Sequence, residues 1–338
     1  MPEVRVDPLT GLKVIVATGR AARPGGAGGG GSSSSADTAF SVAPAPPLDV
    51  ESDPFAEGHE DRTPPELWAV RPGGGEPDTA GWTVRVVPNL HPALTPDAAL
   101  TERDSAPDLF TARPAGGAHE VVINAPQSVT GLAGLAAAQV AEAMDAWRER
   151  MRAHDDAAYV HVMVNERAEA GASLLHTHAQ LFALDFVPAL VARERERFGA
   201  HAARTMGADL LQDVLQEEVR RRERIVAIDD EAVLLAPYAS ALPFQLMLIP
   251  RAPRMRFQDT GQTGAALLHD GLNRLARRLG ASPPLNLWVR TAPRGAEHYC
   301  WRIDIVPRLT GLAGLELGTG VHLNVVAPET AAAGLRDA

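Results

Sequence analysis

The chain has 338 residues and a formal net charge of −10, and 45% of its residues are hydrophobic but only 5% aromatic, so its core must be mainly aliphatic. The negative balance argues against a nucleic-acid-binding surface, the single cysteine, Cys300, excludes an intrachain disulfide, and no uncharged apolar run is long enough to cross a bilayer. Because residues 1–5 also lack the pattern of a signal peptide, we expect a cytoplasmic protein with neither nucleic acid nor membrane as a partner.

The amino-terminal part of the chain divides into an arm and a flexible insert. Residues 1–24 form the expected arm, in which a turn at 7–11 precedes a short strand over 13–17. Residues 25–52 are rich in glycine, serine and proline, so we expect a flexible insert that buries no core. Ordered structure should resume near Asp53.

The segment 53–198 is expected to form a first half of the molecule. Alternating apolar residues predict its strands, and apolar residues at helical spacing predict a helix. The expected elements are strands over 82–87 and 119–124, a helix over 132–154, and strands over 159–165 and after the turn at 166–171. A hairpin is the simplest connection between the last two strands.

The same order of elements returns later in the chain. Residues 188–224 are expected to be helical with a break near His201, and 199–230 to connect the two halves. The second half, 231–330, should contain strands over 233–236 and 245–250, a helix over 264–279, and strands over 285–291 and 299–306. The repeated order of strand, strand, helix, strand, strand predicts an α+β fold with an internal duplication.

The most informative segment is 173–180, which reads Ser-Leu-Leu-His-Thr-His-Ala-Gln. In an extended strand, successive side chains point to opposite faces, so His176, His178 and Gln180 would share one face. Buried polar groups must be paired, and three of them in a row on an otherwise apolar strand therefore indicate a site.

Three interpretations of this segment are open. The histidines could be a hydrogen-bonded structural pair, or two ligands of a zinc or iron site that needs a third ligand. Conceivable third ligands are His119, His161 and Glu194. The third interpretation is covalent catalysis, in which an imidazole nitrogen attacks phosphorus and holds a nucleotidyl group. Ser173 and Gln180 would then be neutral donors to the phosphate oxygens, and a glutamine in place of a third histidine would favour an intermediate that waits for a second substrate.

The segment 165–180 resembles the active-site segment of galactose-1-phosphate uridylyltransferases, the His-x-His-x-Gln transferase branch of the histidine-triad superfamily. Further similar segments are 7–11 with Arg20 and Arg23 after it, 86–89 with 92–94, 236–244, 307–309 and 314–320. The resemblance covers nearly the whole chain apart from the insert. It implies two duplicated histidine-triad-like halves, built mainly of antiparallel sheet with flanking helices.

The resemblance also implies roles for individual residues. His178 matches the nucleophile, Gln180 the residue that binds the transferred phosphoryl group, and Ser173 a donor to phosphate oxygen. His176 would remain as a hydrogen-bonding neighbour of His178. The implied substrate-binding residues are Asn165, Asn89, Arg20, Arg23 and Glu316.

The chain departs from the family at both of the family's metal sites. The zinc-binding Cys-x-x-Cys is replaced by Asp53 and Ala56, and the later histidine by Ser128, so only His176 is left. At the second metal site Glu194 could remain, but the matching His-x-His is read as Cys300 and Arg302. We therefore expect no metal cofactor.

The expected reaction is ping-pong transfer of a uridylyl group between UDP-hexose and hexose-1-phosphate, with a nucleotide sugar and a sugar phosphate as partners. An alternative is adenylyl transfer to phosphate, as in ADP-glucose phosphorylases. Other classes left open are a metal-dependent hydrolase and a non-catalytic nucleotide sensor. The resemblance also implies a homodimer.

Overall fold

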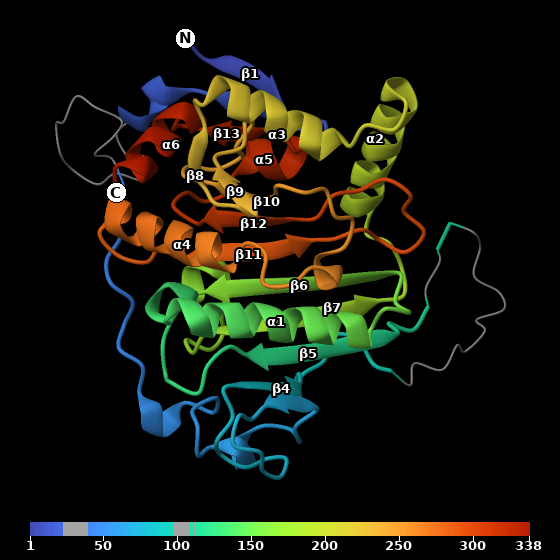
Figure 1. Ribbon diagram of the computed structural model, residues 1–338. Helices are drawn as coiled ribbons and strands as arrows, with labels where there is room; N and C mark the ends of the chain where they lie inside the picture. The colour runs from blue at the N-terminus through green and yellow to red at the C-terminus, as the bar shows by residue number, and fades with distance from the viewer. Residues whose placement is uncertain (23–39, 97–108, 111–112) are drawn as a thin grey trace.

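The computed structural model describes residues 1–22, 40–96, 109–110 and 113–338. Its largest element is a ten-stranded sheet in which all neighbouring strands run antiparallel (Figure 1). In spatial order the strands are β3 (Trp68–Val70), β4 (Val84–Pro88), β5 (Gly117–Ile123), β7 (His178–Leu184), β6 (Tyr159–Glu166), β11 (Leu285–Arg290), β12 (Arg302–Pro307), β10 (Leu246–Pro250), β9 (Ala232–Leu235) and β8 (Ile225–Ile228). A separate three-stranded sheet contains β1 (Glu3–Val6), β2 (Lys13–Val16) and β13 (His322–Asn324).

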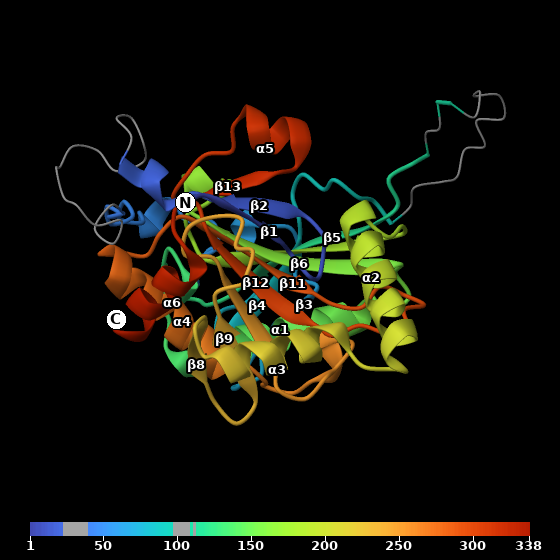
Figure 2. The same cartoon turned by 90° about the horizontal axis from the view of Figure 1, so that it is seen from above.

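The helices flank the large sheet. They are α1 (Ala137–Ala153), α2 (Ala189–Thr205), α3 (Leu210–Arg221), α4 (Ala265–Leu279), α5 (Gly314–Thr319) and α6 (Pro328–Arg336). Figures 1 and 2 show α1 and α4 over one face of the large sheet, and the three-stranded sheet on the opposite side. None of the helices in the described ranges combines the length and the apolar character needed to span a bilayer.

The alternation of side chains on β7 determines where the core and the site lie. Ala179, Leu181 and Ala183 are buried in one cluster with Val140 and Trp147 of α1. Because successive side chains of a strand point to opposite faces, His178 and Gln180 lie on the face away from α1. The aliphatic core thus holds the backbone of the strand that carries the histidine motif.

The register of the sheet confirms that the two halves correspond. β7 pairs with β6 as β12 pairs with β11, and the two hairpin-like pairs meet where β6 contacts β11. Gln180 lies opposite Met163, Met163 opposite Trp288, and Trp288 opposite Asp304, so one row of side chains crosses four strands. The predicted mixed fold and the predicted β6–β7 hairpin are both present.

Three expectations about the elements were wrong. Residues 25–39 of the expected insert lie outside the described residues, but Phe40 is buried and its ring packs edge-on against Phe244, with ring centroids 6.2 Å apart, so the segment expected to bury no core contributes a core residue. The helical region breaks between α2 and α3, after Thr205, and not near His201. The expected helical connection 199–230 also contains β8, and strands β1 and β3 had no counterpart in the sequence prediction.

Candidate active site

His178 is the first residue of β7, and its ring is buried. Its Nδ1 lies 2.8 Å from the carbonyl oxygen of His176, which can only accept, so Nδ1 carries the ring proton and Nε2 keeps its lone pair. Burial lowers the pKa of His178, and the hydrogen bond to the carbonyl offsets only part of that effect. The ring is therefore neutral near pH 7 with a fixed tautomer, as attack on phosphorus requires.

Gln180 is held by a residue on the neighbouring strand β5. Its Oε1 lies 3.0 Å from Nε2 of His119, and Nδ1 of the same ring accepts from the backbone N–H of Ala93 at 3.1 Å. The side-chain nitrogen of Asn89 lies 3.2 Å from Nε2 of His119. His119 thus links the expected phosphoryl-binding residue to the expected nucleotide contact.

The second half of the chain also contributes to the wall of the site. The side-chain nitrogen of Asn286, on β11, donates to Oδ1 of Asn165 on β6 at 2.7 Å.

Phe55 packs against the ring of His178, with centroids 5.2 Å apart. Ser173 lies exposed in the turn that precedes β7. The arrangement leaves His178, Gln180 and Asn165 on one face of two adjacent strands.

His176 precedes β7 and forms a buried ion pair. Its Nδ1 lies 2.7 Å from Oδ2 of Asp53, and its Nε2 lies 2.9 Å from the carbonyl oxygen of Ala125. Both partners are acceptors, so both ring nitrogens donate and the ring is an imidazolium. Ser128 donates to the same oxygen of Asp53 at 2.7 Å. Burial raises the pKa of Asp53, but the hydrogen bonds from His176 and Ser128 outweigh burial and hold that pKa below its usual range.

These contacts do not fit the zinc ion that the family resemblance implies. An imidazole protonated on both nitrogens has no lone pair for a metal, and Ala56 offers only an apolar side chain. The hydroxyl of Ser128 is already used by Asp53. Across the described ranges, no group of three or more His, Cys, Asp or Glu side chains is arranged to hold a metal ion.

At the second expected metal site, the guanidinium group of Arg302 lies against Glu194. Glu194 is buried and receives two hydrogen bonds from the guanidinium of Arg302, at 3.0 and 3.1 Å. Tyr299 adds a third at 2.7 Å, and Arg302 also bonds to Asp304 at 3.2 Å. Nε of Arg290 lies 3.7 Å from the same Glu194, so two guanidinium groups surround this carboxylate. The thiol of Cys300, the other residue matched to this metal site, contacts Gln212 and the carbonyl oxygen of Trp301.

The expected sugar-phosphate residues lie elsewhere. Arg20 is exposed on the short 3-10 helix Thr18–Ala22, and Arg23 lies outside the described residues. Glu316 is in the first turn of α5, where its carboxylate accepts from the backbone N–H of Ala313. Within the described ranges, neither Arg20 nor Glu316 hydrogen-bonds to His178.

Sequence reasoning missed the roles of His119 and Asn286. His119 was considered only as a metal ligand, although its place two residues before Val121 on a strand predicts which face it occupies. Its contact with Gln180 depends on the register of β5 against β7, in which His119 lies opposite Phe182. The hydrogen bond from Asn286 to Asn165 depends on the pairing of β6 with β11, which joins the two halves. One sequence gives no signal for either register.

The chain is similar to proteins of one family over most of its length. Residues 77–188 match the family model described as galactose-1-phosphate uridyl transferase, N-terminal domain, and residues 136–337 match a domain of unknown function. ADP-glucose phosphorylase of Arabidopsis thaliana is 30% identical over 353 residues, which cover 99% of this chain and 93% of that protein. This chain belongs to the galactose-1-phosphate uridylyltransferase family. Its members are nucleotidyltransferases, and so is this protein.

Other members of the galactose-1-phosphate uridylyltransferase family are similar over shorter stretches or in fold. A galactose-1-phosphate uridylyltransferase of Cryptococcus neoformans is 27% identical over 307 residues, 86% of this chain and 74% of that protein. The crystal structure of the Arabidopsis thaliana ADP-glucose phosphorylase with bound ADP-glucose has a TM-score of 0.80 at 28% identity, and covers 100% of this chain and 99% of that one.

Proposed function

We propose that this protein transfers an adenylyl group from ADP-glucose to inorganic phosphate through a covalent intermediate on His178. The observation that carries the chemistry is the fixed tautomer of His178, whose unprotonated Nε2 lies on the same face as Gln180. The choice of adenylyl is supported by the ADP-glucose phosphorylase relative, which matches 99% of this chain, against 86% for the uridylyltransferase. This reverses the order of the two donors expected from sequence.

In the first step, Nε2 of His178 attacks the α-phosphorus of ADP-glucose. A nitrogen–phosphorus bond forms, the bond from the α-phosphorus to the bridging oxygen breaks, and glucose-1-phosphate leaves with that oxygen. Nδ1 keeps its proton throughout, because it donates to the carbonyl of His176. That hydrogen bond stabilises the positive charge that develops on the imidazole during attack.

In the second step, an oxygen of inorganic phosphate attacks the same phosphorus. The nitrogen–phosphorus bond breaks, the imidazole regains its lone pair, and ADP leaves. Gln180 and Asn165 each offer a carboxamide nitrogen that can donate to the non-bridging oxygens, since their Oε1 and Oδ1 atoms already accept from His119 and Asn286. Neutral donors suit both steps because their charge and their donor hydrogens are the same before and after transfer.

We further propose that the reaction needs no metal ion. The support is the pairing of His176 with Asp53 and of Glu194 with Arg302, which uses the lone pairs that a metal would need. Elemental analysis of protein purified without chelator should find zinc and iron well below one atom per chain. Stoichiometric metal, or activity lost to a chelator and restored by zinc, would contradict this proposal and favour the metal-dependent class.

A covalent trap tests the central proposal. Protein is mixed with ADP-glucose or UDP-glucose labelled at the α-phosphate, denatured, and counted. We expect label from ADP-glucose in the wild type, none in His178→Ala, and wild-type label in His298→Ala, which changes an exposed histidine. Phosphate added before denaturation should release the label as ADP.

Two other outcomes are decisive. Label from UDP-glucose that is released by hexose-1-phosphate and not by phosphate would replace the adenylyl proposal with uridylyl transfer. No label from either nucleotide sugar would leave a non-catalytic sensor as the better account.

We also propose a homodimer. The support is that Arg20 and Glu316, which match sugar-phosphate residues, lie away from the hydrogen-bond network of His178 in a single chain. A second copy of the chain would then supply them. Light scattering on purified protein should give a mass of about twice the 35.8 kDa of one chain, and a monomer that retains full activity would contradict this proposal.

A further inference from the structure

His119 lies between the nucleotide-side segment and Gln180. It is on β5 opposite Phe182, and its ring stacks on that phenyl ring with centroids 4.0 Å apart and planes 24° apart. Only 9% of its surface is exposed. Its two nitrogens contact different elements, the backbone N–H of Ala93 and Oε1 of Gln180. A buried ring fixed on its face and at both nitrogens has a single orientation.

The hydrogen-bond partners also fix the tautomer of His119. The amide of Ala93 can only donate, so Nδ1 must hold a lone pair and the proton must be on Nε2. Nε2 then donates to Oε1 of Gln180. The side-chain nitrogen of Asn89, 3.2 Å away, also carries hydrogens, because Oδ1 of Asn89 accepts from His91 N–H at 2.8 Å. Nε2 of His119 therefore accepts no hydrogen bond from Asn89, and its N–H has Oε1 of Gln180 as its acceptor.

This tautomer determines which way the carboxamide of Gln180 points. A flipped carboxamide would bring its NH₂ group against the N–H of His119, and two donors repel. With Oε1 held by His119, the NH₂ group of Gln180 is the part left to face the site. The flipped form would instead present an oxygen to the oxygens of a phosphoryl group.

We propose that His119 is a positioning residue that fixes the carboxamide of Gln180 so that its NH₂ group faces the transferred phosphoryl group. The inference rests on the proposed function, since it assumes that Gln180 binds that group. Through Ala93, the same ring also ties Gln180 to the segment 89–93, which contains the expected nucleotide contact. His119 touches neither reacting atom and acts only through its neighbours.

Two substitutions separate the two hydrogen bonds of His119. His119→Gln can place an amide nitrogen near the position of Nε2 and so keep the donor to Gln180. His119→Asn can place an oxygen near the position of Nδ1 and so keep the acceptor for Ala93, but it removes the donor to Gln180. His298→Gln is the matched control, because that histidine is exposed.

The test measures the single-turnover rate of covalent labelling and the nucleotide-sugar concentration for half-maximal rate, with melting temperature as the check on folding. We expect the maximal rate to fall about 10- to 100-fold in His119→Asn, as misplacement of a catalytic group does, and several-fold less in His119→Gln. The half-maximal concentration should rise more in His119→Gln, because this variant loses the acceptor for the backbone N–H of Ala93. In a Gln180→Ala background, His119→Asn should cause no further loss of maximal rate.

Equal losses of maximal rate in the Asn and Gln variants, at equal melting temperatures, would overturn the inference and leave His119 as a packing residue. Independent, multiplicative losses in the Gln180→Ala background would also overturn it. Both results would leave the proposed function intact, provided that the wild type is labelled. No label in the wild type from either nucleotide sugar would overturn the proposed function and this inference together.

Discussion

One carboxylate oxygen of Asp53 accepts hydrogen bonds from both His176 and Ser128, and the carbonyl of His176 in turn fixes the tautomer of His178. Asp53→Asn removes the negative charge that the imidazolium of His176 needs, and the pair is buried. We expect the free energy of unfolding to fall by about 2–3 kcal/mol at pH 7. The maximal labelling rate should fall about tenfold as the His176 carbonyl moves. Chemical denaturation and the covalent trap measure the two effects.

The pH dependence of this variant gives a second check. The pKa of Asp53 is below its usual range, so its contribution to stability is present above the unfolded pKa and is lost as pH falls through the folded value. The stability gap between wild type and Asp53→Asn should therefore narrow in acid. Asp61→Asn, which changes an exposed carboxylate nearby in sequence, serves as the control. An equal loss in that control would refute a specific role for Asp53.

At the scale of single residues, the sequence predicts the relative placement of side chains that are close along the chain. The spacing of His176, His178 and Gln180 predicts a shared strand face; His178 and Gln180 share one on β7, but His176 precedes the strand. The resemblance also identified Asp53 and Ser128 as replaced metal-ligand positions and His176 as the retained one, but not that Asp53 bonds to His176 and to Ser128 across 123 and 75 residues. The contact between His119 and Gln180 was missed for the same reason, since it depends on strand register.

Glu166 ends β6 on the face that packs against α1, where it is buried and accepts from the backbone N–H of Leu132 at 2.7 Å. Burial raises its pKa to about 7. A raised pKa stabilises the fold below the unfolded value, and that stabilisation is lost as pH rises through about 7. We expect wild type to lose up to about 3 kcal/mol between pH 5 and 8.5 at this group, and Glu166→Gln to lose almost none of that amount.

Melting curves at pH 5, 7 and 8.5 measure this difference. Glutamine keeps the acceptor for Leu132, so the two proteins should melt alike at pH 5 and the variant should melt higher at pH 8.5. Glu196→Gln, at an exposed position on α2, should follow the wild type at every pH. Parallel curves for wild type and Glu166→Gln would show that Glu166 does not titrate as its burial implies.

Elements were predictable where their periodicity extends over enough residues. The alternation in β6 and the helical spacing in α1 and α4 predict all three within a few residues of their ends. Strands β1, β3 and β8 have 3 or 4 residues each and were not predicted, whereas β2 and β9, of 4 residues each, were predicted beside a turn and a proline-containing segment. Phe40 was assigned to the flexible insert because the residues around it are those of a linker, yet its ring is buried against Phe244.

The arrangement of the whole molecule was only half predictable. The repeated order of elements predicts two corresponding halves, and the single sheet that contains both confirms it. The three-stranded sheet was not predicted, because β2 pairs in parallel with β13, about 300 residues later. Figure 2 shows β2 and β13 side by side, on the opposite side of the large sheet from α1 and α4.

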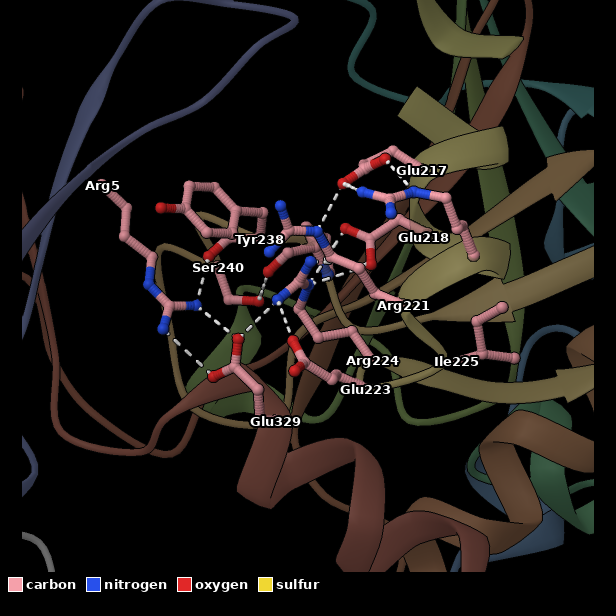
Figure 3. Close-up of polar contacts among 12 residues, drawn as sticks. Arg5, Glu217, Glu218, Arg221, Glu223, Arg224, Ile225, Tyr238, Ser240 and Glu329 are labelled. Atoms are coloured by element: carbon pink, nitrogen blue, oxygen red, sulfur yellow. Dashed lines mark hydrogen bonds and ion pairs between the residues drawn. The ribbon is translucent and has the colours of Figure 1, made fainter. Parts of the chain in front are cut away.

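An ion-pair cluster fastens the small sheet to the second half (Figure 3). Glu329 of α6 accepts from Arg5 of β1 at 2.8 and 3.1 Å, and from Arg224 at 2.6 Å. Both guanidinium groups also lie over the ring of Tyr238, at 4.6 and 5.1 Å from its centroid. Arg224 is bound in addition by the buried Glu218 at 3.0 Å. One carboxylate thus joins two cations that come from distant parts of the chain.

Glu329→Gln should loosen this connection without removing a side chain. The carboxylate is partly exposed, so we expect a loss of about 1–2 kcal/mol and a melting temperature lower by about 2–8 °C. Burial raises the pKa of Glu329, but hydrogen bonds from Arg5 and Arg224 outweigh it and lower the pKa, so the difference from wild type should be full at pH 7 and fade in acid. Glu223→Gln is the matched control, because Glu223 is exposed and lies 3.5 Å from the same Arg224. Glu223→Gln should lower the free energy of unfolding by less than about 0.5 kcal/mol. Equal losses of stability in Glu329→Gln and Glu223→Gln would mean that the ion pair between Arg5 and Glu329 adds no stability.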